Sequence, residues 1–239
     1  MKIKLDNPAL LSRAIEVISD LVIEVRIKIN EFGLGITAID PANVAMVGFK
    51  LPKSAFSEFE VGNEVLGVNL DDFKKILKRC SVKSSLILEK QGNMLNIEIQ
   101  DRIKRNFSLA LIDVEGEDKN LPELNLASTI ELNSDDFIAC VEDCSVVAES
   151  CGFTSENGKF IIDAKGMNSA RTEFGQDEAI ISGENSSSRY SLEYLSKFLK
   201  GAKLVLKTKL NFATNTPLKI DFKSEHFELN FVLAPRVEN

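Results

Sequence analysis

The chain of 239 residues repeats itself, and this internal duplication limits its possible folds more than any other feature. LDNPALLSRAIEVIS at residues 5–19 matches LNSDDFIACVEDCSV at residues 132–146. Each begins with Leu and polar capping residues and continues with apolar residues at helical spacing. Two further pairs match in the same way: residues 69–79 with 191–201, and residues 95–100 with 218–223. The offsets are nearly equal, so a duplicated module is the simplest explanation.

Most of the remaining segments alternate apolar and polar residues, as EVRIKIN and LNIEIQ do. This alternation is typical of half-buried antiparallel strands. Between the copies, the polar stretch GEDKNLPELNLAS contains a proline and predicts an extended linker. We therefore expect an α+β chain with two short helices per module. It would consist of an N-terminal module at 1–115, an interdomain connector at 116–130 and a C-terminal module at 131–239.

Composition excludes several classes of protein. Hydrophobic residues make up 44% of the chain and charged residues 27%, which is ordinary for a globular protein. No apolar run reaches the ~18 residues of a membrane span, and the N-terminus lacks the apolar stretch of a signal peptide. These features predict a soluble protein inside the cell.

Neither a metal site nor a catalytic site is expected. Cys140 and Cys144 are four residues apart and could share a helix face, but a structural zinc site needs four ligands and the only histidine, His226, is remote. Small core residues are the simpler interpretation. The sequence has no glycine-rich phosphate loop or nucleophile motif, and the serine-rich GENSSSRYS reads as a surface loop. We expect no cofactor and no enzymatic activity.

The stretch DDFKKILKRC at residues 71–80 concentrates positive charge in a chain whose net charge is −7. It predicts a helix capped by Asn69 or Asp71. Its apolar stripe consists of Phe73, Ile76, Leu77 and Cys80. Its opposite face carries Lys74, Lys75 and Lys78, with Arg79 on the flank. Such a face can simply be solvated, but the recurrence of outward cations in the second copy, Lys197 and Lys200, favours a functional surface.

Several segments resemble the proliferating cell nuclear antigen family of DNA sliding clamps, in its archaeal form. They are GVNLDDFKKILKRC, LIDVEGEDKNLPEL, GITAIDPANVAMVGFKLP and the ending LNFVLAPRVEN, and their order fits nearly the whole chain. The resemblance implies a ring of three subunits whose helices line a hole around duplex DNA. It places these cations toward the hole: Arg13, Lys74, Lys75, Lys78, Lys197 and Lys200.

The third expected helix departs from that plan because it is acidic, with Asp135, Asp136, Glu142, Asp143 and Glu149. The family geometry places it beside the basic helix of a neighbouring subunit. Arg79 and Lys83 would then pair with Glu142, Asp143 or Glu149 across the boundary. An apolar strand at 106–113 would pair with a strand at 177–183 of the neighbour, hiding two exposed edges. The strand residues expected at this boundary are Phe107, Leu109, Leu111, Ala179, Ile180 and Ile181.

The resemblance also implies a partner site under the connector. By position it consists of Ile39, Asn43, Val44, Met46, Leu121, Pro122, Pro217, Leu218, Ala234, Pro235, Arg236 and Val237. Ala234 and Arg236 would offer backbone groups to a glutamine in a partner's short tail. Glu117 and Lys119 stand where relatives often have apolar residues, so the choice of partner is open.

The function implied by the resemblance is that of a DNA polymerase sliding clamp, a processivity factor working on chromosomal DNA in the cytoplasm of an archaeon. The expected partners are duplex DNA, a clamp loader ATPase, DNA polymerase, flap endonuclease and DNA ligase, together with identical or paralogous subunits. Two alternatives remain: a duplicated protein-binding module that does not encircle DNA, and an enzyme built on the same modules.

Overall fold

The computed structural model describes residues 1–115 and 120–237 and divides the chain into two compact units. Unit 1 contains Met1–Pro41, Val47–Asn120 and Glu225–Glu228. Unit 2 contains Ala42–Met46, Leu121–Ser224 and Leu229–Asn239. The chain passes between the units at 41–42, 46–47, 120–121, 224–225 and 228–229, and the third of these points lies within the predicted connector. None of the described helices is both long and apolar enough to cross a membrane.

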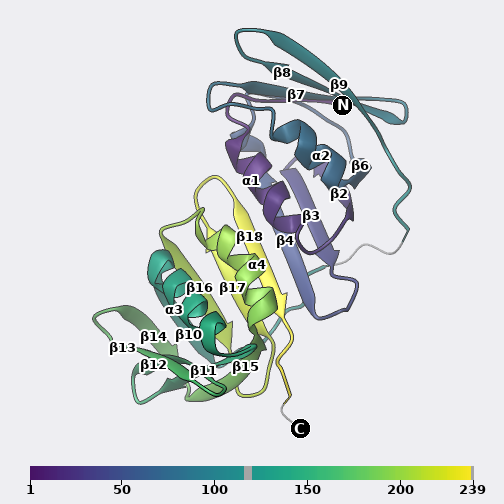
Figure 1. The fold of residues 1–239 in the computed structure, drawn as a ribbon. Coiled ribbons are helices and arrows are strands. Elements are labelled where there is room, and N and C mark those ends of the chain that lie inside the picture. The colour runs from purple at the N-terminus through teal and green to yellow at the C-terminus, as the bar shows by residue number, and fades with distance from the viewer. Residues whose placement is uncertain (116–119, 238–239) are drawn as a thin grey trace. The chain divides into compact units, whose positions relative to one another are not determined.

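Unit 1 contains two helices among its strands (Figure 1). Its elements are β1 (Lys2–Leu5), α1 (Ala9–Ile18), β2 (Glu24–Asn30), β3 (Gly33–Ile39), β4 (Ala45–Pro52, of which Val47–Pro52 belong to unit 1), β5 (Glu58–Glu60), β6 (Glu64–Asn69), α2 (Leu70–Leu77), β7 (Ser85–Gln91), β8 (Met94–Gln100) and β9 (Lys104–Ala110). A short 3-10 turn, Lys53–Ala55, follows β4.

Unit 2 repeats the same order of elements. They are β10 (Ser128–Asn133), α3 (Ser134–Val147), β11 (Ser150–Glu156), β12 (Lys159–Lys165), β13 (Ser169–Phe174), β14 (Ala179–Gly183), β15 (Ser186–Ser191), α4 (Leu192–Ala202), β16 (Lys207–Phe212), β17 (Leu218–Lys223) and β18 (Glu228–Leu233).

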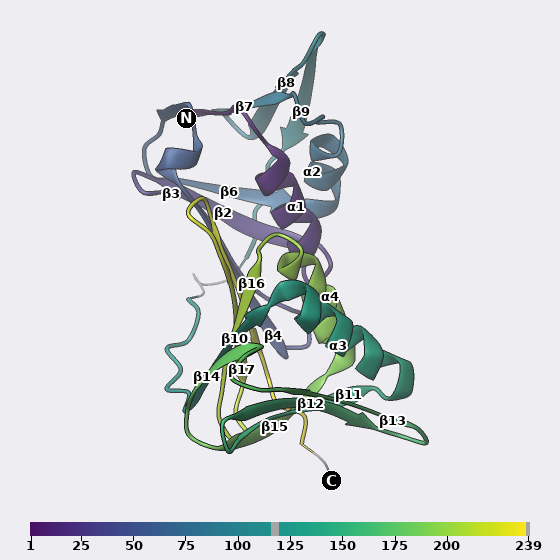
Figure 2. The same ribbon diagram turned by 90° about the vertical axis from the view of Figure 1, so that its left-hand side faces the viewer.

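Strand pairing repeats as well. In unit 1 the strands run β5-β1-β7-β8-β9 and β4-β3-β2-β6, and in unit 2 they run β14-β10-β16-β17-β18 and β13-β12-β11-β15. Each strand of one list has its counterpart at the same place in the other. Figure 2 shows the strands of both units from a second direction. The predicted duplication and the α+β fold class are confirmed.

Two of the described helices, α2 and α3, begin at an asparagine whose side chain caps them. Asn69 caps α2 by accepting a hydrogen bond from the Asp72 amide at 3.2 Å, and Asn133 caps α3 by accepting one from the Asp135 amide at 2.8 Å. Asn69 is thus the cap of α2, and Asp71 lies inside the helix. At its other end α3 stops at Val147. Glu149, expected on this helix, therefore lies in the link that precedes β11.

The two cores use different side chains. In unit 1 the helices bury aliphatic residues such as Leu11 and Ile15 beside Leu77. In unit 2 the Phe153 ring meets four other rings edge-on, with centroids 5.4 to 6.4 Å apart, in the offset geometry that aromatic pairs prefer. These four rings belong to Phe137, Phe160, Tyr190 and Phe212.

Candidate functional site

The lysines of α2 have polar partners within unit 1. The Lys78 ammonium lies 3.1 Å from the Glu16 carboxylate of α1. The Lys74 ammonium donates to the Ser19 hydroxyl at 2.9 Å and lies 3.1 Å from Asp71. Both contacts of Lys74 hold its head near the helix, and its side chain is only 22% exposed. Lys74 is therefore less available to an external anion than the sequence suggests.

Lys75 and Arg13 project further into solvent. The Lys75 side chain is 74% exposed and its ammonium lies 2.9 Å from Asp72. The hydrogen bond that Lys75 donates to the Asp72 carboxylate raises the pKa of Lys75, so this lysine keeps its charge at neutral pH. Arg13 is exposed on α1. Contacts between such exposed charges are worth little, so phosphate groups can replace the carboxylates as partners.

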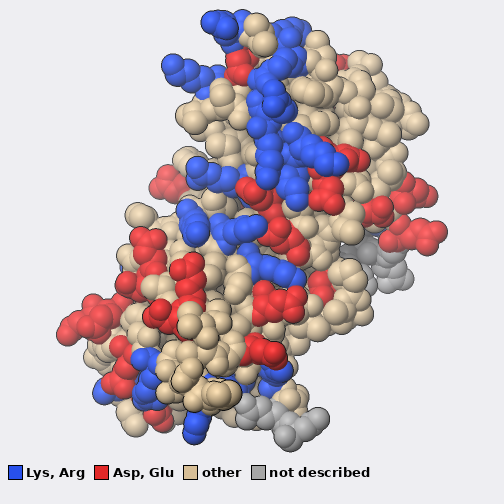
Figure 3. All heavy atoms as spheres, in the orientation of Figure 1, with Lys and Arg blue, Asp and Glu red and all other residues tan. Residues whose placement is uncertain are grey.

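In unit 2 the cations that are predicted to face DNA, Lys197 and Lys200, lie on α4. The Lys197 ammonium lies 3.1 Å from Glu193 and 5.0 Å from the centre of the Tyr194 ring, and Lys200 is exposed near the end of the helix. Figure 3 shows Lys and Arg gathered over α1, α2 and α4, where the sequence predicts a DNA-facing surface. That these residues face DNA stays a prediction.

The α3 helix has the opposite character. It carries four carboxylates and no lysine or arginine, and Figure 3 shows acidic side chains over it. Glu142 and Asp143 are exposed, and so is the apolar Val146, at 84%. One exposed apolar side chain is ordinary on a protein surface, so the distinctive feature of α3 is its concentration of carboxylates.

The predicted boundary strand of unit 1 is placed as an edge strand. β9 is the outermost strand of its sheet and, among the described strands, pairs with β8. Leu109 is 8% exposed, whereas Phe107 and Leu111 are half-buried. Arg79 and Lys83 are exposed in the segment that follows α2. Unit 1 therefore presents a sheet edge with cations nearby in the chain.

The corresponding residues of unit 2 lie on β14 and differ in exposure. β14 pairs with β10, where Ala179 is buried and Ile181 half-buried, and only Ile180 is substantially exposed, at 60%. α3 packs against β12 and β13, and β13 is itself the outermost strand of its sheet. β14 is also outermost in its sheet, so unit 2 has an edge strand at β14 and another at β13, beside the acidic helix. That 177–183 lies at the subunit boundary stays a prediction.

Of the twelve residues predicted to bind partners, eleven lie in unit 2 and Ile39 lies in unit 1. Two chain segments of the set meet where the Ala234 amide donates to the Val44 carbonyl at 2.9 Å. Met46, Leu121, Pro217 and Pro235 are half-buried, whereas Asn43, Pro122 and Val237 are exposed. Leu218 is fully buried in β17, so it belongs to the core rather than to a binding surface.

The backbone groups predicted to receive a partner's glutamine are partly occupied. The Ala234 amide is bonded to Val44, and the Arg236 amide donates to the Arg189 carbonyl at 2.7 Å. These two amide groups are therefore not available to a partner's glutamine in this conformation. The Arg236 guanidinium also lies 3.6 Å from the Glu149 carboxylate, which was expected at the subunit boundary. Glu117 and Lys119 lie outside the described residues.

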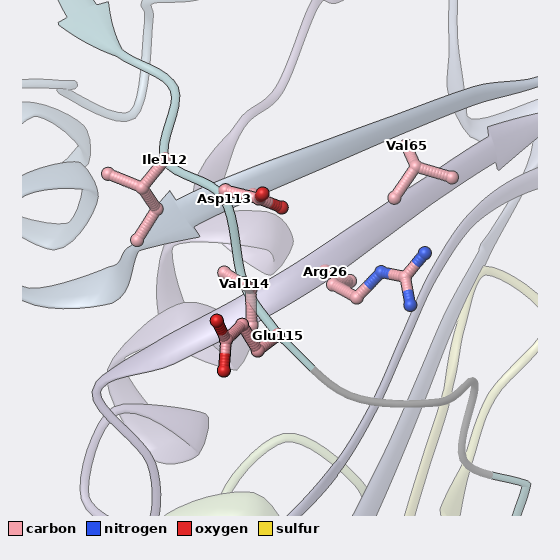
Figure 4. A pocket seen from close by; sticks show the side chains of 7 residues that line it. Arg26, Val65, Ile112, Asp113, Val114 and Glu115 are labelled. Atoms are coloured by element: carbon pink, nitrogen blue, oxygen red, sulfur yellow. The ribbon is translucent and has the colours of Figure 1, made fainter.

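One hollow of unit 1 was not foreseen from the sequence. It measures about 530 Å³ and lies between the segment 112–115 and the strands β2 and β6 (Figure 4). The Ile112 amide donates to the Gly67 carbonyl at 3.0 Å, and a Cβ on residue 67 would lie only 2.0 Å from the Ile112 carbonyl oxygen. Glycine at position 67 is therefore required for this close approach. The glycine within the apolar stretch VLGVN was the available signal.

The cysteines are core residues. Cys140, Cys144 and Cys151 are buried in unit 2, and Cys80 is half-buried in unit 1. Burial raises the pKa of Cys80 to about 11, so its thiol is not reactive at neutral pH. Across residues 1–115 and 120–237, no three Cys, His, Asp or Glu side chains are grouped so that they could hold a metal.

Comparison with known proteins gives one consistent result. A family model described as "Proliferating cell nuclear antigen, N-terminal domain" matches residues 1–119. The "DNA polymerase sliding clamp" of Thermococcus gammatolerans is 37% identical over 228 residues, covering 92% of each chain, and that of Pyrococcus abyssi is 35% identical, covering 95% of this chain and 94% of the relative.

Solved structures agree with these relatives. The proliferating cellular nuclear antigen of Entamoeba histolytica superposes with a TM-score of 0.92 at 26% identity, covering 99% of this chain and 98% of the other. A PCNA from A. fulgidus, solved with the C-terminal region of FEN-1 bound, gives a TM-score of 0.91 at 27% identity, covering 100% and 99%. The similarity extends over both units.

Proposed function

The chain belongs to the proliferating cell nuclear antigen family of DNA polymerase sliding clamps, and we propose that three subunits close into a ring around duplex DNA. The observation that carries this proposal is the full-length match to curated sliding clamps. The repeated order of strands and helices supports it, because two equivalent units per chain give a ring its regular wall. A sliding clamp is a processivity factor, and we propose no catalytic activity for it.

The lysines on α2 and α4 suit a surface that slides on DNA. Duplex DNA carries about one negative charge per 1.7 Å, and lysines that approach its phosphates release counterions. Phosphate contacts position a protein without reading sequence, as sliding requires. Because the carboxylate partners of Lys75, Lys78 and Lys197 lie on the same helix or the adjoining one, these ammonium groups can exchange carboxylate for phosphate over short distances. Binding is therefore topological, with weak and replaceable contacts.

We propose that β9 of one subunit pairs with β13 of the next, rather than with β14. β9, β13 and β14 are each outermost in their sheets, and β13 is the edge strand of unit 2 against which the acidic α3 packs. β13 packs beside α3, so this pairing also brings the Glu142 and Asp143 carboxylates toward Arg79 and Lys83 of the neighbour. Closing the ring covers two free edges that would otherwise promote aggregation. Ile180 of β14 then stays on the surface.

Partners are tethered, in our proposal, by short tails that bind unit 2. The A. fulgidus clamp binds the C-terminal region of FEN-1, which supports a similar tail-binding role here. The half-buried Met46, Leu121 and Pro235 offer apolar contacts. Polymerase, nuclease and ligase held in this way have a raised effective concentration at DNA. A clamp loader ATPase would open the ring, and the clamp would act on chromosomal DNA in the cytoplasm of an archaeal cell.

The alternative, a duplicated protein-binding module that does not encircle DNA, predicts a different assembly. Native mass spectrometry of the purified chain at micromolar concentration tests both. A ring gives a species of about 80 kDa, three times the 26.5 kDa subunit, either alone or after mixing with paralogous subunits. A protein that stays monomeric under both conditions contradicts the ring.

A further inference from the structure

A polar cluster at the end of α2 is not part of any surface described above. Its centre is the Asp101 carboxylate, in the turn between β8 and β9. One oxygen accepts hydrogen bonds from the hydroxyls of Ser84 and, at 3.2 Å, Ser81. The other oxygen accepts from the Arg105 guanidinium of β9. One carboxylate thus joins the segment after α2, the β8–β9 turn and the edge strand.

The side chains of this cluster are largely shielded from water. Ser84 is fully buried, and the side chains of Asp101 and Arg105 are 20% and 23% exposed. The Ser84 hydrogen bond, followed by those from Ser81 and Arg105, lowers the pKa of Asp101, so it is charged at neutral pH. Hydrogen bonds to a charged acceptor are stronger than neutral ones.

The same hydroxyls shape the backbone of the segment. The Ser81 amide donates to the Ser84 hydroxyl at 2.7 Å, and the Lys83 amide donates to the Ser81 hydroxyl at 3.3 Å. The Ser84 amide closes the turn on the Ser81 carbonyl at 3.1 Å. Asp101 therefore fixes the two serines that hold this turn.

The turn carries side chains that have no evident role within a single subunit. Val82 is 86% exposed at its tip, and Ile103 is 61% exposed in the neighbouring β8–β9 turn. Lys83 and Arg102 stand beside them in the sequence and are also exposed. An apolar pair flanked by cations complements the exposed Val146 of α3 with its neighbours Glu142 and Asp143.

We propose that Asp101 is a positioning residue for ring closure. It holds residues 81–84 against β9, so that Val82, Ile103 and Lys83 form one patch that binds the α3 surface of the next copy. The inference rests on the proposed ring and adds to it a residue that would not itself touch the neighbour. Because the turn is already ordered before assembly, binding does not carry the entropic cost of ordering it.

The test compares Asp101→Asn with Glu98→Gln in sedimentation velocity over a dilution series. Asp101→Asn removes the charge and keeps the shape, and the ring should dissociate at roughly tenfold higher concentration. Glu98 lies on the same hairpin, and its carboxylate pairs with the Lys104 ammonium at 2.6 Å rather than with the hydroxyls of Ser81 and Ser84. Its replacement should shift dissociation less than about threefold. Equal behaviour of the two variants would overturn the inference.

A mixing experiment separates positioning from general damage. The seam is the proposed boundary at which unit 1 of one subunit meets unit 2 of the next. Asp101→Asn alters only the unit 1 side of the seam, whereas Glu142→Lys with Asp143→Lys alters only the unit 2 side. Each variant alone should assemble poorly, and their mixture should give dimers joined through the one seam at which both sides are unaltered. Failure to form this dimer, while the parent chain forms rings, means that Asp101→Asn damages the fold and overturns the inference. A monomeric parent chain overturns the ring itself.

Discussion

The α1 helix of unit 1 and the α3 helix of unit 2 occupy the same place in the two copies of the fold and differ in charge. The charges of Arg13 and Glu16 on α1 balance each other, whereas α3 carries four carboxylates and no cation in its own sequence. Both helices keep their buried apolar faces. The copies are thus held alike by packing and have diverged on the surface, as expected if each surface meets a different neighbour.

The cores of the two units also differ, because in unit 2 four aromatic rings surround Phe153. Phe153→Ala removes the ring that touches four others, and we expect a loss of about 3–5 kcal/mol in the free energy of unfolding. Both tyrosines, Tyr190 and Tyr194, lie in unit 2, so tyrosine fluorescence during urea unfolding reports on that unit. Phe32→Ala is the control, since Phe32 is 77% exposed. Similar midpoints for the two variants would refute the aromatic core.

The next largest effect is expected on the affinity for a partner's tail peptide, because most of the predicted partner site lies in unit 2. Leu121→Ala with Pro122→Ala should weaken binding of a synthetic tail peptide by about 2 kcal/mol or more, roughly thirtyfold, as loss of an apolar anchor does. Ile39→Ala, the member in unit 1, should weaken it less. Calorimetry measures both, and sedimentation should show unchanged assembly. An unaltered affinity in the double variant would place the site on other residues.

Reversing the charge of α3 tests whether its acidity serves the seam. Glu142→Lys with Asp143→Lys should raise the concentration at which the ring dissociates by on the order of tenfold, because exposed pairs contribute only about 0.2–1 kcal/mol each. The effect should be larger at low salt, where screening is weak. Ser182→Lys, in β14, serves as a control at an exposed position. If this control weakens assembly more than the α3 variant, β14 rather than β13 forms the seam.

The smallest effect is expected from the lysines. Replacing Lys75, Lys78, Lys197 and Lys200 by Ala should leave the fold and assembly unchanged and reduce the salt dependence of loading onto DNA, because fewer counterions are released. Loading measured over a salt series gives this slope. A slope equal to that of the parent chain would show that these side chains do not approach phosphates.

The sequence predicted what depends on local pattern and missed what depends on tertiary neighbours. Helical spacing and Asn69 located α2, and the internal repeat indicated two equivalent modules. The pairing of Lys78 with Glu16 and of Arg236 with Glu149 could not be foreseen, because these partners come from distant parts of the chain. The packing of α3 against the edge strand β13 could not be foreseen either, because it depends on tertiary contacts that a local pattern does not show.

The central claim is that the chain encircles DNA rather than gripping it. Loaded complexes on closed circular DNA and on the same DNA cut once, with free ends, test this most directly when retention is measured by gel filtration at moderate salt. The ring account predicts stable retention on the circle and rapid loss from the linear duplex, with loss prevented when bulky proteins block both ends. Equal retention on circular and linear DNA would contradict it.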